Sequence, residues 1–526
     1  MNNNQNPYQQ QVPPQMGQGM MPPPPPMPQP MGRRARWNNR LMSGVAARIT
    51  SLPKWFATYA MGTYAVALLG VNMLFSSYAM EWYFWLFGIA WVGGFFFLSV
   101  KYSQEWSIRH IRSEKVFEKR LFVTGFVIRI LYSVFIYFFY LEMTGAPHEF
   151  ATADSTEYLE TARWFLREWQ ADRLGETLGS YSQSSLGDIG FPLYLMIPVS
   201  LISGDGVVLL VQTVNALFGA MTSVFIYRIA RRSMGESTAR IAAIFCMLHP
   251  VLICYVGVTL KEVFMTFLVV LFIDMGDRML RERKYSLATI LPLVLVGLSL
   301  FLFRVVLGAI MFLALFFALV MMDSRIVSWG KKVAFGVLII GVLMMAASDT
   351  IIREVNKLSF QEARSQQETS LTYRYGEKKS GGQGNAFAKY AGAAVFAPLI
   401  FTIPFPTMVD VGSQQDMRLI HGGNWMRNVM SGFVLLAMFM LLLSGDWRKY
   451  TLPLAMLLGY LLMLAFTTFA HSLRFHIPVM PFEMMFAAYA ITNMRKKHRN
   501  WYMIWCILCI VMCFGWNWMK LKGRGL

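Results

Sequence analysis

The chain has 526 residues, of which 56% are hydrophobic and only 15% are charged, and its mean hydropathy is +0.43. Soluble domains carry roughly 25% charged residues, so this composition excludes a soluble globular protein. The formal net charge of +19 does not indicate nucleic-acid binding, because no basic groove with interleaved aromatic residues lies outside the apolar runs. Lysine and arginine also collect on the cytoplasmic side of membrane proteins, which explains the charge better.

Apolar runs recur along almost the whole chain, with the length of about 20 residues that a helix needs to cross a bilayer. In lipid, the backbone polar groups must be satisfied within each segment, so these runs are helices rather than isolated strands. We therefore predict an all-α polytopic membrane protein with about 11–13 transmembrane helices. All five cysteines lie in apolar runs, which favours core packing over metal or redox chemistry.

The N-terminal part differs from the rest. Residues 1–32 are rich in Pro, Gln and Met, a composition that predicts a disordered tail. Basic residues without acidic neighbours follow it, which indicates a cytoplasmic N-terminus. Residues 33–120 then contain two spans, near 57–78 and 83–100, and a second basic loop.

A third span, near 121–143, leads into an acidic outer loop, 144–190. The stretch from His148 to Tyr194 carries eight acidic side chains against three basic ones, in a chain that is otherwise long apolar helix. Asp154 and Glu157 come first, with Tyr158 at helical spacing. This pattern predicts a water-exposed acidic helix after the third span, and its charges indicate function.

The positions of the basic clusters indicate the membrane topology of the rest of the chain. The apolar runs that follow are 207–227, 241–257, 262–277, 286–303, 305–322, 333–347, 429–444, 451–469 and 475–492. Basic clusters after alternate runs place those ends in the cytoplasm. Two Pro-interrupted stretches, 191–206 and 390–409, would invert this order if they crossed, so we interpret them as re-entrant or interfacial.

Two further regions are predicted from this topology. Residues 348–427 form an outer loop, predicted to be mobile, with acceptor capture as the alternative role. A C-terminal apolar segment, 496–526, ends in a basic tail with Lys520 and Lys522. This tail falls on the outer side, against the positive-inside rule.

The same topology brings a set of ionisable residues to the outer boundary of the membrane. They are Asp154, Glu157, Asp188, Lys261, Glu262, Arg304, His471 and Arg474. Each alone is compatible with a snorkelling or paired structural charge. Together they predict a basic pocket at the depth of lipid phosphates, facing an acidic loop. Cations there would hold a phosphate leaving group, and a carboxylate would take a proton from an attacking hydroxyl.

Four segments in the right order resemble motifs of GT-C glycosyltransferases, multi-spanning enzymes that use polyprenyl-phosphate-linked sugars. ADSTEYLETARWF is similar to their first outer-loop motif, and GFPLYL to the Pro-containing segment before their second span. HPVLICYVGVTLKEVFMTFLVVL resembles their later Pro…Glu element, and RFHIPVMPFEMMFAAYAI their C-terminal Arg and Pro run. The resemblance covers residues 121–495.

The resemblance implies roles for the boundary residues. Asp154 would be the general base of an inverting transfer, a role that Glu157 or Asp188 could share. The substrate-binding residues would be Tyr158, Asp188, Lys261, Glu262, Arg304, His471 and Arg474. The donor would be a polyprenyl-phosphate sugar in the membrane lipid, and the acceptor a glycan, lipid or protein. The acidic loop could hold Mg or Mn, although no ligand spacing there requires a metal.

Transfer would then take place outside the cytoplasm, and we expect a bacterial cytoplasmic (inner) membrane. Two alternatives stay open at this point. One is a polysaccharide polymerase or ligase of the O-antigen kind, which joins longer lipid-linked glycans. The other is a transporter or flippase, for which charges near the bilayer midplane and repeated halves would be expected.

Overall fold

The computed structural model describes residues 51–321, 336, 398–412, 414–467, 469–494 and 498–522. The predicted disordered tail 1–32, the predicted span 333–347 and most of the predicted outer loop 348–427 lie outside the described residues. What is described is helical and belongs to one unit, 45–526. In these ranges β pairing is limited to an isolated antiparallel bridge between Ala79 and Val409.

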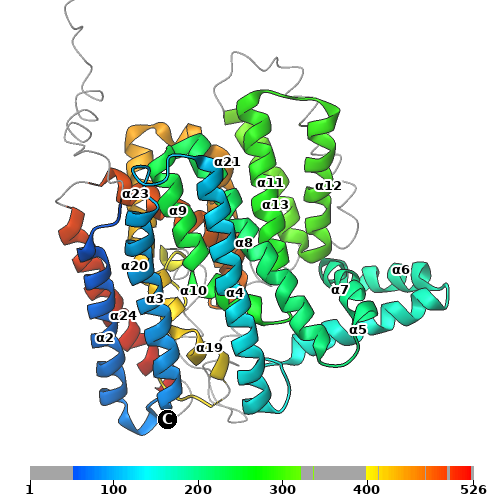
Figure 1. The fold of residues 1–526 in the computed structure, drawn as a ribbon, viewed down its shortest axis with the longest axis horizontal. Coiled ribbons are helices and arrows are strands. Elements are labelled where there is room, and N and C mark those ends of the chain that lie inside the picture. Colours follow the sequence, from blue (N-terminus) through cyan, green and yellow to red (C-terminus); the bar gives the residue numbers. More distant parts are fainter. Residues whose placement is uncertain are drawn as a thin grey trace, which may run out of the picture. The chain divides into compact units, whose positions relative to one another are not determined.

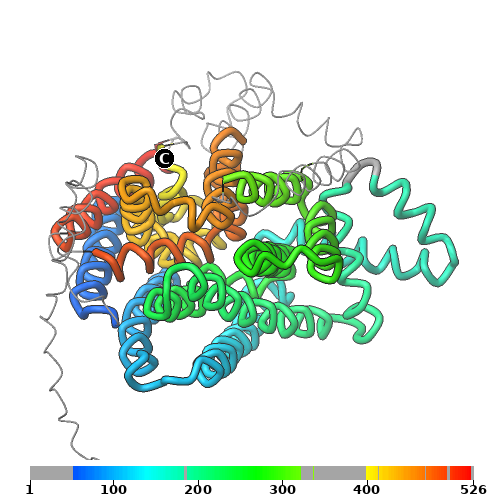
Figure 2. Tube along the Cα trace, turned by 90° about the horizontal axis from the view of Figure 1, so that it is seen from above, coloured from blue at the N-terminus to red at the C-terminus, as the bar shows by residue number. Residues whose placement is uncertain are grey.

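The N-terminal half of the unit contains helices α2 Lys54–Leu74, α3 Trp82–Glu105, α4 Glu114–Thr144, α5 Ala153–Gln170, α6 Leu174–Ser185, α7 Gly190–Leu201, α8 Gly206–Met234, α9 Glu236–Leu248, α10 Pro250–Cys254, α11 Glu262–Glu282, α12 Leu287–Phe303 and α13 Val305–Met321. The C-terminal half contains α19 Gln415–Leu419, α20 His421–Ser444, α21 Thr451–Ala465, α22 Leu473–His476, α23 Met480–Asn493 and α24 His498–Lys522. Figure 1 shows that most of the longer helices run side by side. The α5–α6 pair extends away from this bundle in both views (Figures 1 and 2).

By length and composition, six helices of the described part can cross a membrane: α2, α3, α4, α8, α20 and α24. The number rises to eight if each of two bent helix pairs counts as one span, and α12 and α13 are shorter apolar helices. The predicted class, an all-α polytopic membrane protein, is confirmed.

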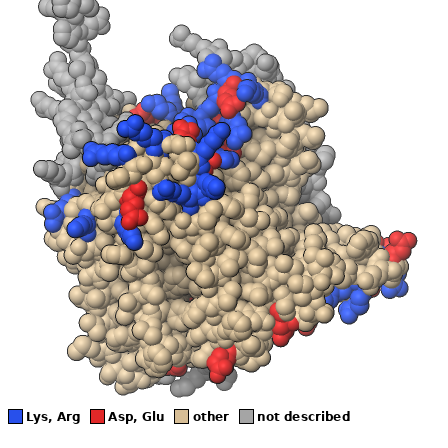
Figure 3. Space-filling view, viewed as in Figure 1, with Lys and Arg blue, Asp and Glu red and all other residues tan. Residues whose placement is uncertain are grey.

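The predicted basic loops come together at one end of the bundle. Arg228 of α8 pairs with Glu118 of α4, and Arg232 pairs with Asp274 and Asp277 of α11. Figure 3 shows lysine and arginine side chains gathered at this end, with little charge along the sides of the bundle. Such a distribution is typical of a protein whose apolar sides face lipid.

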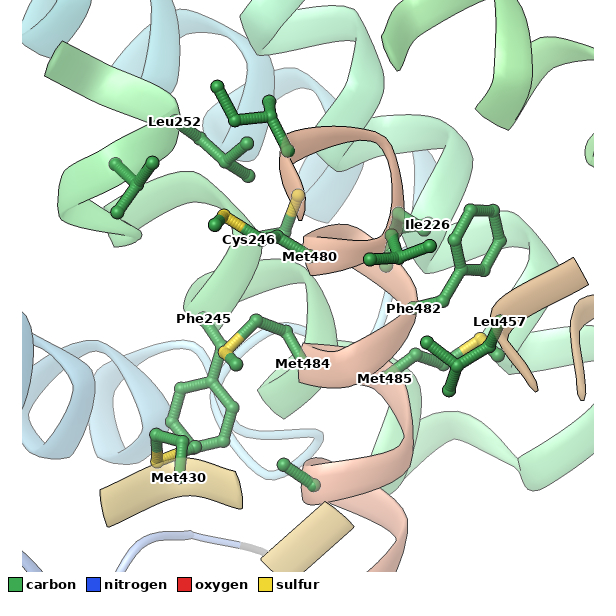
Figure 4. Packing of buried hydrophobic residues seen from close by; sticks show 14 of the residues in the cluster. Ile226, Phe245, Cys246, Leu252, Met430, Leu457, Met480, Phe482, Met484 and Met485 are labelled. Atoms are coloured by element: carbon green, nitrogen blue, oxygen red, sulfur yellow. The ribbon is translucent and has the colours of Figure 1, made fainter. Parts of the chain in front are cut away.

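Helix α23 lies at the centre of the bundle, because it is buried on every side from Met480 to Thr492. A helix that is apolar all round has to be covered by other helices. Figure 4 shows Phe482 directed toward Ile226 of α8, and Met485 toward Leu457 of α21. This packing fixes α22, which leads into α23 through the 3-10 turn Ile477–Val479.

Two predicted segments are bent rather than straight. The predicted span 241–257 is the pair α9 and α10, bent by 49° where Pro250 begins α10. Proline lacks an N–H donor and suits the first position of a helix. The Pro-containing stretch 191–206 starts with α7, which makes an angle of 114° with α6. Both bends bring helix ends to the boundary where the predicted site residues lie.

The described part of the second Pro-interrupted stretch, from residue 398, is irregular backbone clamped by buried side chains. Arg427 donates to the carbonyls of Ile403 and Ile400, and Asn428 donates to those of Thr402 and Pro404. Irregular backbone within a membrane protein needs such partners, because lipid offers none. Both donors lie on α20, which begins at His421, so the end of the range 348–427 is helical.

The C-terminal lysine that violated the charge rule has a partner inside the protein. Lys520 is only 4% exposed and donates to Thr407 and Gln414. Asn517, one turn earlier, also receives the N–H of Met408. Because Lys520 is bound to the segment that contains Thr407 and Gln414, its charge does not indicate on which side of the membrane the C-terminal end lies.

Candidate active site

Arg474 stands at the centre of the predicted site. Its Nη1 donates to Asp154 Oδ2, and its Nε donates to Glu262 Oε1. Asp154 lies in the first turn of α5 and Glu262 is the first residue of α11, while Arg474 comes from α22. The side chain of Arg474 is 18% exposed and that of Asp154 is 52% exposed. One arginine therefore joins three parts of the chain at the end opposite the basic loops.

Glu262 faces a second arginine with the same carboxylate oxygen. Arg304 lies between α12 and α13, and its Nη2 is 3.7 Å from Glu262 Oε1. Its Nη1 donates to the hydroxyl of Tyr460 on α21 at 2.8 Å, and the guanidinium lies 4.3 Å from the centre of the Phe475 ring. Glu262 is fully buried, and its Oε2 has no hydrogen-bond partner in the described part of the chain.

We call these three side chains, Arg474, Glu262 and Arg304, the arginine pair with its counterion. These three side chains carry a net charge of +1, and Asp154, which also pairs with Arg474, brings the group to neutrality. A guanidinium has five N–H donors, and the contacts above use only some of them. The group can therefore accept an anion without losing Glu262, whose burial requires a cation beside it.

Lys261 and Asp188 form a second group next to the first. Lys261 donates to Asp188, to the carbonyl of Gly187 at 3.1 Å and to the carbonyl of Phe303 at 2.8 Å. These contacts use the three donors of an ammonium group. Tyr158 donates to Asp188 Oδ1 at 3.1 Å, so α5 joins the same group. Lys261 thus ties η2 (Leu186–Asp188) to the end of α12.

The predicted site residues do not all meet. Seven of them form the two neighbouring groups described above: Asp154, Glu262, Arg304 and Arg474 in one, and Tyr158, Asp188 and Lys261 in the other. Glu157 is exposed on α5 and takes part in none of these ion pairs. His471 is buried three residues before Arg474, and its part in binding stays a prediction.

Sequence reasoning missed three residues of this region. Tyr460 lies within an apolar span, and its neighbours give no sign of a partner. Asp416 of α19 accepts the backbone N–H groups of Phe150 and Ala151, which lie more than 260 positions earlier in the chain. Glu149 is 6% exposed, and burial raises the pKa of its carboxyl to about 7. Each was part of a longer stretch already predicted to be outer or apolar, but no local pattern set it apart.

The carboxylates of the region are arranged around cations of the protein. Asp154 and Glu262 pair with Arg474, and Asp188 pairs with Lys261. Within the residues described, no three His, Cys, Asp or Glu side chains are grouped so that they could hold a metal ion. The geometry thus offers positive charge for an anion and one half-exposed carboxylate, Asp154, beside it.

Comparison with known proteins supports the same chemistry. Residues 186–354 match the family model of the Alg9-like mannosyltransferases, a GT-C fold family of membrane glycosyltransferases that use polyprenyl-phosphate sugar donors. The match covers Asp188, Lys261, Glu262 and Arg304, and Asp154 and Arg474 lie outside it. No curated protein and no solved structure matches the chain. The expected resemblance to GT-C enzymes is confirmed over these residues, and it supports a membrane glycosyltransferase with a lipid-linked donor.

Proposed function

We propose that the protein transfers a sugar from a polyprenyl-phosphate-linked donor to a glycan, lipid or protein acceptor, with inversion at the anomeric carbon. The observation that carries the proposal is the arginine pair with its counterion directly beside Asp154. It combines positive charge for a leaving phosphate with a carboxylate that can take a proton.

The leaving group becomes more negative during transfer, because the electrons of the bond between the anomeric carbon and the phosphate oxygen stay on that oxygen. Guanidinium groups stabilise such charge well, since their planar N–H donors match phosphate geometry. Arg474 and Arg304 are 18% and 12% exposed, so their charges act in a site with little water. Donors held in place in such a site stabilise the transition state more than the ground state.

Asp154 serves as the base. The acceptor hydroxyl attacks the anomeric carbon from the side opposite the phosphate, and its proton passes to the Asp154 carboxylate. One displacement with one base inverts the configuration. Asp154 is 52% exposed, so a hydroxyl group from solution or from the membrane surface can reach it. Its bond to Arg474 places the base next to the phosphate site.

The site lies at the end of the bundle opposite the basic connections. By the positive-inside rule those connections are cytoplasmic. We therefore place the reaction on the extracytoplasmic face, in a bacterial cytoplasmic membrane, where the phosphate of a polyprenyl carrier lies at the surface and its chain remains in lipid.

The test is sugar transfer in membranes that contain wild type, Asp154→Asn or Glu160→Gln, with a panel of polyprenyl-phosphate sugars. Asn keeps the shape of Asp and removes the base, so we expect transfer to fall by roughly two to four orders of magnitude. Glu160→Gln is the matched control, because Glu160 is an exposed acid of the same helix, is not a candidate base and lies outside the ion pairs described above.

The outcomes separate the two parts of the proposal. A wild type that uses no donor of the panel would contradict the proposed reaction. If the wild type transfers sugar and the Asp154→Asn variant is fully active as well, the proposed reaction stands but Asp154 is not its base. The protein level in each membrane preparation shows whether a loss of transfer reflects a loss of protein.

A further inference from the structure

The loop between α4 and α5 is held by one carboxylate from a distant part of the chain. Asp416 Oδ1 accepts the N–H of Phe150 at 3.2 Å, and Asp416 Oδ2 accepts the N–H of Ala151 at 2.9 Å. Hydrogen bonds to a charged acceptor are roughly twice as strong as neutral ones. Two consecutive N–H groups on the two oxygens of one carboxylate fix the direction of the backbone as well as its position.

This loop leads directly into the helix that carries the proposed base. Ala151 comes three residues before Asp154, and α5 begins at Ala153. The N-cap residue Thr152 makes no side-chain capping bond, so the first turn lacks the local contact that most often fixes a helix start. The loop before α5, held by Asp416, therefore helps to place Asp154, together with the bonds from Arg474 to Asp154 and from Tyr158 to Asp188.

Neighbouring contacts hold the loop against α4 but leave its backbone direction to Asp416. The Phe150 ring lies edge-on against Tyr140 of α4, with ring centres 5.7 Å apart. Glu149 is buried beside it. An edge-on ring contact tolerates sliding, whereas two hydrogen bonds to one carboxylate do not. Asp416 is therefore a main contact, beside the hydrogen bond between Glu149 and Ser155 of α5, that sets how the chain enters this helix.

Asp416 itself sits on a firmly attached segment. Arg418 of the same short helix α19 pairs with Asp410 at 2.6 Å and lies over the Phe84 ring of α3 at 4.7 Å. Lys520 of α24 donates to Gln414, two residues before Asp416. The segment also bonds to the α2–α3 connection, where Tyr78 accepts the N–H of Asp410 at 2.8 Å. Helices outside the family match thus support the residue that holds the loop.

We propose that Asp416 is a positioning residue for the reaction: by holding the N–H groups of Phe150 and Ala151 it places Asp154 against Arg474. This inference rests on the proposed function and deepens it. Asp416 does not touch the reacting atoms in this account, so its loss lowers turnover through the placement of the base. Donor binding by the arginine pair is left intact.

The test compares Asp416→Ala, Asp416→Asn and the control Glu105→Ala, an exposed acid at the last residue of α3. For each purified variant, kcat and the donor KM are measured, together with deuterium exchange of the peptide 145–153. A displacement of a catalytic group by about 1 Å costs on the order of 10²-fold in rate. We expect Asp416→Ala to lower kcat by about that factor, with an unchanged donor KM and faster exchange in the loop.

Asp416→Asn keeps one acceptor oxygen, so we expect it to recover much of kcat and of the protection from exchange, and Glu105→Ala to match wild type. The proposal is overturned if Asp416→Ala exchanges like wild type in the loop, or if its kcat is unchanged while exchange rises. It is also overturned if Ala and Asn variants lose turnover equally with a normally folded protein. A wild type without transfer activity would refute the proposed function instead, and the exchange data would still decide whether Asp416 holds the loop.

Discussion

Two arginine–glutamate pairs in this protein differ in how completely their hydrogen-bonding groups are used. Arg427 of α20 and Glu483 of α23 are 1% and 2% exposed and bonded through both carboxylate oxygens, at 3.0 and 2.8 Å. The remaining donors of Arg427 reach the carbonyls of Ile403 and Ile400 and the ring of His476. In the site, one oxygen of Glu262 serves two arginines, and its other oxygen has no hydrogen-bond partner within the described ranges.

The difference separates a structural pair from a binding site. A saturated guanidinium deep in a bundle holds helices and irregular backbone together and has nothing left for a ligand. Two guanidiniums that share one oxygen of Glu262 keep N–H donors that the described contacts do not use. In the sequence, both pairs are charged residues in apolar surroundings and cannot be told apart. The contacts indicate which pair has N–H donors available for a phosphate.

The largest effect is expected from breaking the saturated pair. Arg427→Leu leaves Glu483 as an uncompensated buried charge, which costs about 3–5 kcal/mol in such pairs, and releases the carbonyls of the 398–412 segment. We expect a large fall in Tm and in the yield of folded protein in detergent. Arg474→Gln should keep Tm near wild type, because Arg304 still neutralises Glu262.

The double variant Arg427→Leu with Glu483→Leu controls for the charge itself. Removing both charges should recover part of the lost stability, since paired apolar groups of similar volume often replace a buried ion pair. The distinction between a structural pair and a binding site would be contradicted if Arg427→Leu were as stable as wild type. It would also be contradicted if Arg474→Gln failed to fold.

A smaller effect is expected at Glu149, a buried carboxyl that forms none of the ion pairs of the described part. Burial raises its pKa from 4.5 to about 7. The unfolded chain therefore releases this proton at lower pH than the folded chain. The contribution of Glu149 to stability is complete below about pH 4.5, is lost as the pH rises through 7, and amounts to at most roughly 3 kcal/mol.

Glu149→Gln removes this titration. We expect the Tm of the variant to exceed that of wild type by a margin that grows from pH 5 to pH 7 and is constant above, as measured by thermal unfolding in detergent. A Tm difference that does not change with pH would show that Glu149 is charged throughout this range, paired as Glu483 is.

Much of the fold follows from composition. The predicted span 121–143 lies within α4, and 305–322 coincides with α13, because apolar runs of this length have no other stable form in lipid. The joint position of Arg474 and Asp154, 320 positions apart, also followed from charge-based topology, since both had to lie at the same boundary.

The remaining features depend on tertiary contacts. Nothing in the sequence around Lys520 shows that Thr407 will accept a hydrogen bond from it, so its charge could only be seen as a conflict with the positive-inside rule. The three donors of Lys261 meet protein oxygens, an arrangement set by the ends of η2 and α12 that its sequence does not show, and its part in substrate binding stays a prediction. Asp416 could not be found, because its partners are backbone N–H groups, which every residue except proline carries.

The central claim is that the arginine pair binds the phosphate of the lipid carrier while Asp154 acts only in the chemical step. The direct measurement is the Kd of a polyprenyl phosphate in detergent for wild type, Arg474→Gln, Asp154→Asn and the control Arg499→Gln at the opposite end. Losing a charged hydrogen-bond partner should weaken binding by Arg474→Gln roughly 10- to 100-fold. Asp154→Asn and Arg499→Gln should bind as wild type does. Equal binding by wild type and Arg474→Gln would contradict the account.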